Sequence, residues 1–129
     1  MSTILVDNLT GKTTDGDITV TSEGGAATMQ LQQGLAKHWS NFEMAATFVA
    51  NDSFNQSSLT DVAAGTAAPV FTNNMANTTY SDVAMTTEIT TSGDLTNKTA
   101  ATYRIYGLNS ANAAADPTEN CTIVVGDLA

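Results

Sequence analysis

Lysine and arginine are scarce in this sequence of 129 residues: together they number four, against thirteen Asp and Glu. The formal net charge is therefore −9 at pH 7. Such a charge repels phosphate backbones, and the chain has no basic stripe from which bound counterions could be released. The charge balance argues against nucleic acid as a partner.

Cysteine and histidine occur once each, as Cys121 and His38. A single cysteine excludes an intrachain disulfide and a zinc cluster built on several thiolates, and a single histidine excludes a histidine-based metal cage. No stretch approaches the roughly 18 apolar residues of a membrane span, and the opening residues lack the features of a signal peptide. We expect a protein made in the cytoplasm, with no cofactor, no metal and no membrane partner.

Threonine, asparagine and serine dominate what is present, with 22, 11 and 9 residues. Threonine is β-branched and fits a pleated surface, whereas asparagine and serine form turn bonds that compete with helix. The 19 alanines instead favour helix, because alanine has the highest helix propensity. The composition favours strands and turns, and the length suits one domain.

Short segments of alternating or β-branched residues recur at spacings of about ten residues, with no long helices between them. The predicted strands cover Ile4–Val6, Ile18–Val20, Met29–Leu31, Thr47–Ala50, Ser57–Val62, Val70–Thr72, Tyr80–Ile89, Thr102–Leu108 and Cys121–Val125. This arrangement predicts an all-β fold, a single antiparallel β-sandwich or jelly-roll-like domain over residues 33–129. Residues 1–32 are predicted to form an N-terminal strand or arm segment.

The segment Leu35–Phe42 fits two structures. Its apolar residues have a helical spacing, but Leu35, Lys37 and Trp39 also alternate as on a strand. Periodicity leaves both open.

Several short segments predict turns and loops. Asp15-Gly16-Asp17 is interpreted as a hairpin turn, because the later ligands of a twelve-residue calcium loop are missing. Ser92-Gly93-Asp94 predicts another turn, and Ala64-Gly65-Thr66 a loop between two strands. Pro69 predicts a strand start or an edge strand. The segment Asn109–Asn120 predicts a polar loop.

The residues that could carry chemistry form no recognisable set. The carboxylates are scattered, with no pair spaced for acid and base roles. A catalytic triad would have to bring Cys121 or a serine to His38, and no nucleophile-elbow or phosphate-binding glycine motif occurs. Cys121 opens an apolar strand and is predicted to pack in the core. We therefore assign no catalytic, cofactor-binding or metal-binding residue.

Aromatic residues offer an alternative of another class. Trp39 with Phe42, and Tyr103 with Tyr106, could form a sugar-binding shelf, because aromatic rings bury a large area while keeping polar edges. Core anchoring is the preferred role for Trp39. A carbohydrate-binding module requires exposed rings, whereas a structural protein is expected to bury Trp39 in the domain or at a subunit interface.

Several blocks resemble a β-rich domain of virion proteins of tailed phages, including tail fibres of the marine type. The resemblance covers residues 33–129. It is carried by Gln33–Phe42, Asp52–Asp61, Phe71–Asn77 with Tyr80, Tyr103–Ile105 and Val124–Asp127. The opening Met1–Lys12 resembles the segment that often precedes this domain. The chain departs from the pattern at Glu43–Ala46, at Asn51 and at Val62–Pro69, where the family has a glycine-rich turn, a basic residue and a tight hairpin.

The resemblance implies a non-enzymatic virion structural protein, and it brings no catalytic residues. Because 129 residues without heptads or solenoid repeats supply little reach, a capsid decoration or cement protein is favoured over a fibre. The expected partners are further copies of the chain, with a trimer favoured, and the major capsid protein or tail proteins. The alternative is a tail-fibre or receptor-binding component whose Asn109–Asn120 and Ala63–Ala68 loops form a recognition tip.

Overall fold

A computed structural model of the chain describes residues 4–11, 18–25, 27–92 and 96–129. The structure divides into two compact units, Met1–Leu35 and Ala36–Ala129, here called unit 1 and unit 2. No residue in the described ranges is helical, and so none belongs to a membrane-spanning helix.

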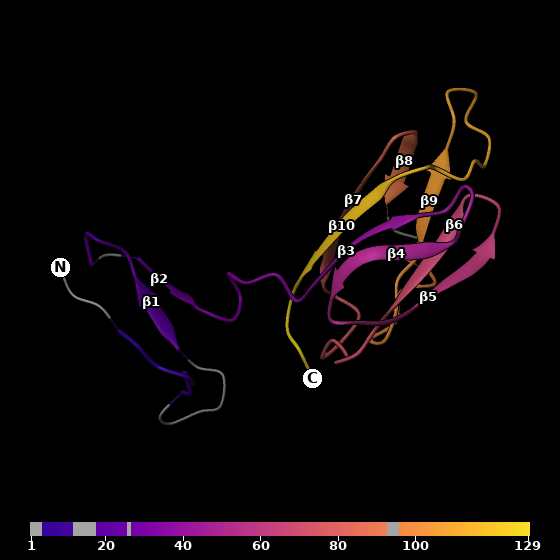
Figure 1. Cartoon of the computed structure of the whole chain (residues 1–129). Helices are drawn as coiled ribbons and strands as arrows, with labels where there is room; N and C mark the ends of the chain where they lie inside the picture. Colours follow the sequence, from indigo (N-terminus) through magenta and orange to yellow (C-terminus); the bar gives the residue numbers. More distant parts are fainter. Residues whose placement is uncertain (1–3, 12–17, 26, 93–95) are drawn as a thin grey trace. The chain divides into compact units, whose positions relative to one another are not determined.

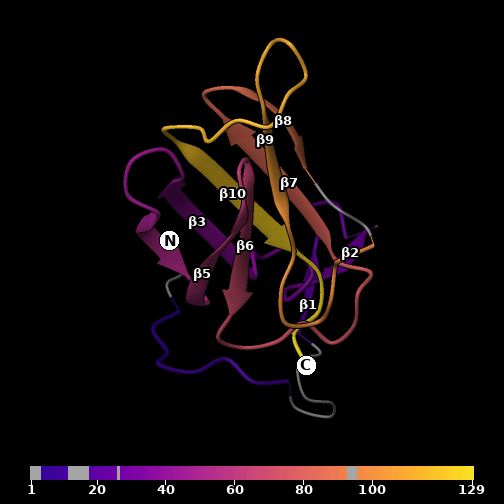
Figure 2. The same ribbon diagram turned by 90° about the vertical axis from the view of Figure 1, so that its right-hand side faces the viewer.

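Unit 2 is a sandwich of two antiparallel four-stranded sheets, which confirms the predicted all-β fold class (Figures 1 and 2). Sheet I has the strand order β4 (Val49–Phe54), β3 (His38–Glu43), β10 (Asn120–Val125) and β7 (Ser81–Thr86). Sheet II has the order β5 (Gln56–Ala63), β6 (Thr66–Phe71), β9 (Ile105–Leu108) and β8 (Ile89–Ser92). The last strand, β10, lies in the interior of its sheet.

The core lies between the two sheets. Phe42 and Val124 enter it from sheet I, and Phe71, Ala67 and Ile105 enter it from sheet II. Alternation explains this placement: in β10 every second residue is buried, and the intervening residues face outward. Side chains on successive residues of a strand point to opposite faces, so half of each strand builds the core and half builds the outer surface.

A polar and aromatic cluster fills the core beside these aliphatic residues. The ring of His38, on β3, is fully buried and meets the rings of Phe71 and Tyr103 edge-on. The Tyr103 hydroxyl lies 3.2 Å from His38 Nδ1 and 2.8 Å from the Thr122 hydroxyl. Gln56 Oε1 lies 3.3 Å from His38 Nε2. Both ring nitrogens therefore have partners, as buried polar atoms require.

Burial lowers the pKa of His38 to about 4, with the Gln56 hydrogen bond opposing the shift. The unfolded chain, whose histidine has a pKa near 6.5, therefore binds a proton at a pH where the folded chain does not. The contribution of the neutral His38 to the free energy of unfolding is fully present above pH 6.5, and it is lost as the pH falls toward 4. We expect the free energy of unfolding in urea to decrease by about 2 kcal/mol between pH 7.5 and pH 5. A constant value over this range would contradict the burial of the imidazole.

A buried ion pair ties β7 to the segment before β9. The Lys98 ammonium lies 2.7 Å from Asp82 Oδ1, and the two side chains are 7% and 5% exposed. Lys98 also donates to the Tyr80 carbonyl and lies 4.0 Å from the centre of the Tyr80 ring. The Tyr80 hydroxyl in turn donates to the carbonyls of Thr99 and Thr102. Burial, with the nearby Asp82 charge, raises the pKa of Tyr80.

The β5–β6 turn packs against the loop that follows β9. Gly65 has a φ of 69°, which glycine adopts without strain, and its carbonyl accepts a bond from the Gly107 amide. Its own amide donates to Asp116 Oδ1. The predicted connection at Ala64–Thr66 is confirmed at Ala64 and Gly65, whereas Thr66 already belongs to β6, and the polar loop before β10 is confirmed. The predicted recognition loop Ala63–Ala68 is wrong, because the turn is tight and β6 starts at Thr66.

The structure also decides two further expectations from the sequence, for the segment Leu35–Phe42 and for Pro69. The segment left open between helix and strand contains β3, a strand. Pro69 lies in β6, an interior strand, so the edge prediction is wrong. The strand tolerates proline because β6 pairs with β9 only at Thr66 and Ala67, which leaves no ladder bond for the missing N–H of Pro69 to donate there.

Unit 1 contains a two-stranded sheet of β1 (Thr19–Thr21) and β2 (Thr28–Gln30), which confirms two of the predicted N-terminal strands. The predicted strand Ile4–Val6 is wrong, since the described residues of unit 1 offer it no partner strand. The predicted turns at Asp15-Gly16-Asp17 and Ser92-Gly93-Asp94 involve residues outside the described ranges.

Candidate docking surface

The sequence-predicted chemical residues do not come together. His38 points into the core, whereas Cys121, on the neighbouring strand β10, is exposed on the outer face of sheet I. The imidazole contacts Tyr103 and Gln56 instead of a thiol. Among the described residues, no three His, Cys, Asp or Glu side chains gather as metal ligands. The prediction that Cys121 packs in the core is wrong.

The two predicted aromatic shelves are not formed. Phe42 and Tyr103 are buried in the core, so neither can share an exposed shelf with Trp39 or Tyr106. Trp39 lies on the opposite face of β3 from Phe42 and is 38% exposed, so its predicted role as a core anchor is also wrong. The two neighbours of Trp39 in β3, His38 and Ser40, are polar and point into the core.

An apolar row crosses the outer face of sheet I. Phe54, Trp39, Ile123 and Val83 are direct cross-strand partners on β4, β3, β10 and β7 in that order. Each of the four side chains is between 38% and 57% exposed. Val125 and Met85, which are also exposed, flank the row on β10 and β7. Directly opposite side chains on a sheet lie about 5 Å apart, so the row is continuous across all four strands.

Polar and acidic side chains form one end of the same face. Asn41 occupies the position next to Trp39 on this side of β3, and it donates to Glu119 Oε1 and Cys121 Sγ. Its Oδ1 accepts a bond of 2.8 Å from Asn51. Acidic side chains on this end belong to Glu43, Asp52 and Glu119. The outer face of sheet I, here called the docking face, is therefore apolar along one row and acidic at one end.

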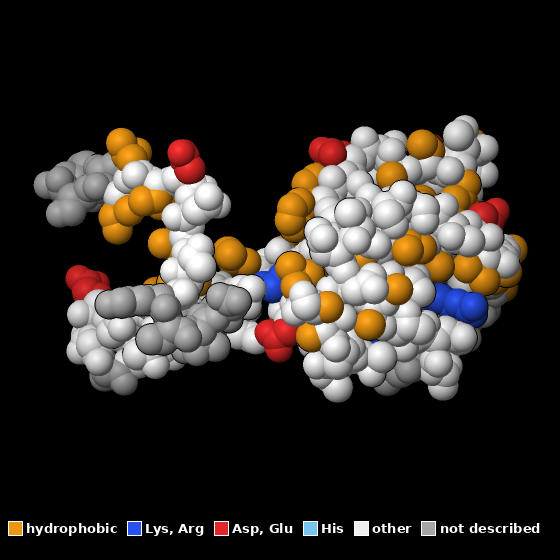
Figure 3. Space-filling view, turned by 90° about the horizontal axis from the view of Figure 1, so that it is seen from below, with side chains coloured by type: hydrophobic (Ala, Val, Ile, Leu, Met, Phe, Trp, Pro, Cys, Tyr) orange, Lys and Arg blue, Asp and Glu red, His pale blue; other side chains and the backbone are white. Residues whose placement is uncertain are grey.

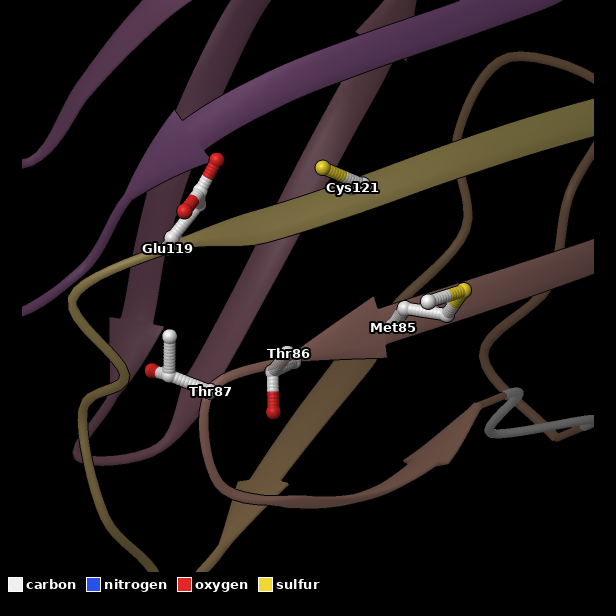
Figure 4. A pocket seen from close by; sticks show the side chains of 5 residues that line it. All are labelled: Met85, Thr86, Thr87, Glu119 and Cys121. Carbon is white, nitrogen blue, oxygen red and sulfur yellow. The ribbon is translucent and has the colours of Figure 1, made fainter.

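A shallow hollow of about 220 Å³ lies where the two parts of this face meet. Its lining residues come from β7, β10 and the chain beside them: Met85, Thr86, Thr87, Glu119 and Cys121 (Figure 4). Figure 4 shows Glu119 and Cys121 projecting from the same side of the chain, with Met85 on the adjacent strand. The hollow gives the docking face a recess at its acidic end.

No exposed cation balances this acidic end among the described residues of the face. Lys37 is buried, and burial lowers its pKa despite the opposing charge of Asp127. The Lys98 side chain is buried against Asp82. Arg104 lies beside the strands of sheet II, and Lys12 falls outside the described residues. The charges on the docking face are therefore complementary to a basic surface and repel a second acidic one.

The docking face is better suited to binding the surface of another protein than to catalysis. Contiguous apolar area on the outside of a domain, bordered by polar groups, marks contact sites for other proteins. Aromatic residues in such a row are the residue types that contribute most to binding energy. The sequence did not reveal this face: the inward residues of β10 are Asn120, Thr122 and Val124, and the more apolar set, Cys121, Ile123 and Val125, faces outward.

Comparison with known protein families, with curated proteins and with solved structures finds no match to this chain.

Proposed function

We propose that this protein is a non-enzymatic structural component of a bacteriophage particle, most simply a capsid decoration or cement protein. In this role the docking face of unit 2 lies against the major capsid protein, and the chain assembles as a homo-oligomer, with a trimer favoured. The observation that carries the proposal is the exposed row Phe54–Trp39–Ile123–Val83. The family is suggested by the sequence resemblance described above.

The charge of the docking face supports a partner that differs from the chain itself. Its acidic end, with Glu43, Asp52 and Glu119, matches a partner surface that is apolar in the centre and basic at one edge. A second copy of this chain could hardly supply such a basic surface, because only four of its residues are Lys or Arg. Electrostatic attraction would orient the domain on its partner, and the apolar row would hold it there.

A carbohydrate-binding module remains the second candidate, and one observation favours it. Trp39 and Phe54 are neighbours on the open sheet surface, an arrangement on which a sugar ring could stack. The row continues, however, through Ile123 and Val83, which offer no hydrogen bonds to sugar hydroxyls. Titration with polysaccharides, followed by Trp39 fluorescence, distinguishes the two: glycan binding shifts the emission of this single tryptophan.

Copy number tests the proposed function. We expect quantitative mass spectrometry of purified particles to find hundreds of copies of this chain, in a fixed ratio to the major capsid protein, because a shell repeats its subunits by symmetry. A few dozen copies or fewer would move the assignment to the tail-fibre alternative, in which the 109–119 loop is a recognition tip. Absence from particles would contradict both.

A further inference from the structure

The inner face of sheet I is polar on its two central strands, β3 and β10. His38, Ser40, Asn120 and Thr122 lie on the core side of these strands, and none of them is more than 6% exposed. On the side of unit 2 that Figure 3 shows, hydrophobic side chains are visible at the surface and the single histidine is not. Buried polar groups need hydrogen-bond partners, so this inner face must find them inside the core.

Two atoms of this polar set have no protein partner. Ser40 Oγ and Asn120 Oδ1 are buried, and neither is hydrogen-bonded to another group in the part of the chain that the structure describes. Turning the Asn120 amide over does not help, because its Nδ2 already donates to the Phe42 carbonyl at 3.2 Å. After such a turn two oxygen acceptors would face each other. A further molecule must therefore supply the missing hydrogen bonds.

The strand register brings these two atoms close enough for one small molecule to bridge them. Ser40 is opposite Thr122, and Phe42 is opposite Asn120, so Ser40 and Asn120 are diagonal neighbours on the inner face. The backbones of diagonal neighbours lie about 7 Å apart. A molecule that forms two hydrogen bonds of about 2.8 Å each spans up to about 5.6 Å between side-chain atoms.

Thr122 offers this molecule a third contact. Its hydroxyl oxygen accepts a hydrogen bond of 2.8 Å from Tyr103, and its own hydroxyl hydrogen can be donated to a bridging molecule. Space is present on β3 as well, because Ser40 lies between His38 and Phe42 on the inner face. A serine side chain fills much less volume than the ring on either side of it. The site is thus polar and has room for one small molecule.

The chemistry of the three residues identifies the molecule as water. Asn120 Oδ1 only accepts, so the molecule must donate a hydrogen to it, and hydroxyl groups can donate or accept. A sodium ion would meet the same oxygens, but its charge would be unpaired. The described buried residues include no Asp or Glu, and the Asp82 carboxylate is already paired with Lys98. Burying an unpaired charge is costly, whereas burying a neutral water with three partners is not.

We propose that unit 2 binds one internal water molecule between β3 and β10, hydrogen-bonded to Ser40 Oγ, Asn120 Oδ1 and the Thr122 hydroxyl. The water completes the polar inner face and stabilises the register of the two central strands. A slip of either strand by one residue would turn its polar residues outward and break these hydrogen bonds. The same register keeps the apolar row on the docking face. The inference does not depend on the proposed function.

A high-resolution crystal structure of the full chain tests this proposal. We expect a density peak within about 2.7 to 3.2 Å of both Ser40 Oγ and Asn120 Oδ1. The peak should be lost in Ser40→Val, because the larger apolar side chain fills the space and removes one partner. Ser53→Val is the matched control: Ser53 is the cross-strand partner of Ser40 on β4 and is only half-buried, so this variant should keep the peak.

Three results would overturn the inference. The first is a wild-type structure in which both atoms bond directly to protein groups or no peak lies between them, a result that needs no variant. The second is a peak that persists unchanged in Ser40→Val. The third is an anomalous peak at this position in crystals soaked in rubidium chloride, which would identify a cation site instead of a water site.

Discussion

Replacing Asp82 by alanine should lower the free energy of unfolding by about 3 to 5 kcal/mol, because it leaves the Lys98 ammonium buried without a counter-charge. The remaining contacts of Lys98, with the Tyr80 carbonyl and ring, do not neutralise the charge. The loss bears on function, since Asp82 lies on β7, an edge strand of the docking face. Chemical denaturation at pH 7 measures it.

The matched control removes both charges. The double variant Asp82→Ala with Lys98→Met should recover a large part of the lost stability, because an apolar side chain carries no cost of burying an unpaired charge. A decrease of less than about 1 kcal/mol for Asp82→Ala alone would show instead that the pair behaves like an ion pair on the protein surface.

Replacing Ile123 by aspartate should reduce incorporation into particles by more than about 100-fold. Ile123 is central in the apolar row, between Trp39 and Val83. Covering a carboxylate there without a partner costs several kcal/mol, and each 1.4 kcal/mol is about tenfold in binding. The folded domain should tolerate the change, because residue 123 faces outward and is 45% exposed. Particles assembled with equal amounts of wild-type and variant protein give the ratio by mass spectrometry.

Thr60→Asp is the matched control for this experiment. Thr60 is an exposed residue of β5, in the middle of an edge strand of the other sheet, so it receives the same charge away from the docking face. It should enter particles as wild type does. Equal incorporation of all three proteins would show that sheet I does not face the particle.

The strands of unit 2 could largely be predicted from the sequence, because alternation and turn residues are local signals. Cys121–Val125 and Thr102–Leu108 both contain strands of the sandwich. The N-terminal prediction at Ile4–Val6 failed for the opposite reason: a strand exists only where another strand pairs with it, and pairing is not a local property.

The docking face could not be predicted, because alternation shows that a strand has two sides but not which side is the core. In β3 the inward positions hold His38, Ser40 and Phe42, while Trp39 faces outward. By residue type alone the tryptophan is the better core residue. The burial of His38 depends on hydrogen bonds with Tyr103 and Gln56, which are distant in the sequence. No local sequence pattern predicts these hydrogen bonds.

The apolar row also depends on how the strands pair across the sheet. Phe54, Trp39, Ile123 and Val83 are spread over 85 residues of sequence, from Trp39 to Ile123, and become one surface only through the registers of three strand pairs. A shift of one residue in any register would turn that strand's apolar side chain to the other face. The surface is a property of the fold.

Reactivity of the Cys121 thiol tests the central claim most directly, because this single cysteine is exposed on the docking face and needs no substitution to serve as a probe. Labelling with a maleimide would be followed by mass spectrometry in the free protein and in purified particles. The proposed docking predicts rapid labelling of the free protein and strong protection in particles, with reactivity restored when the particles are dissociated. Equal labelling rates in the free protein and in intact particles would contradict it.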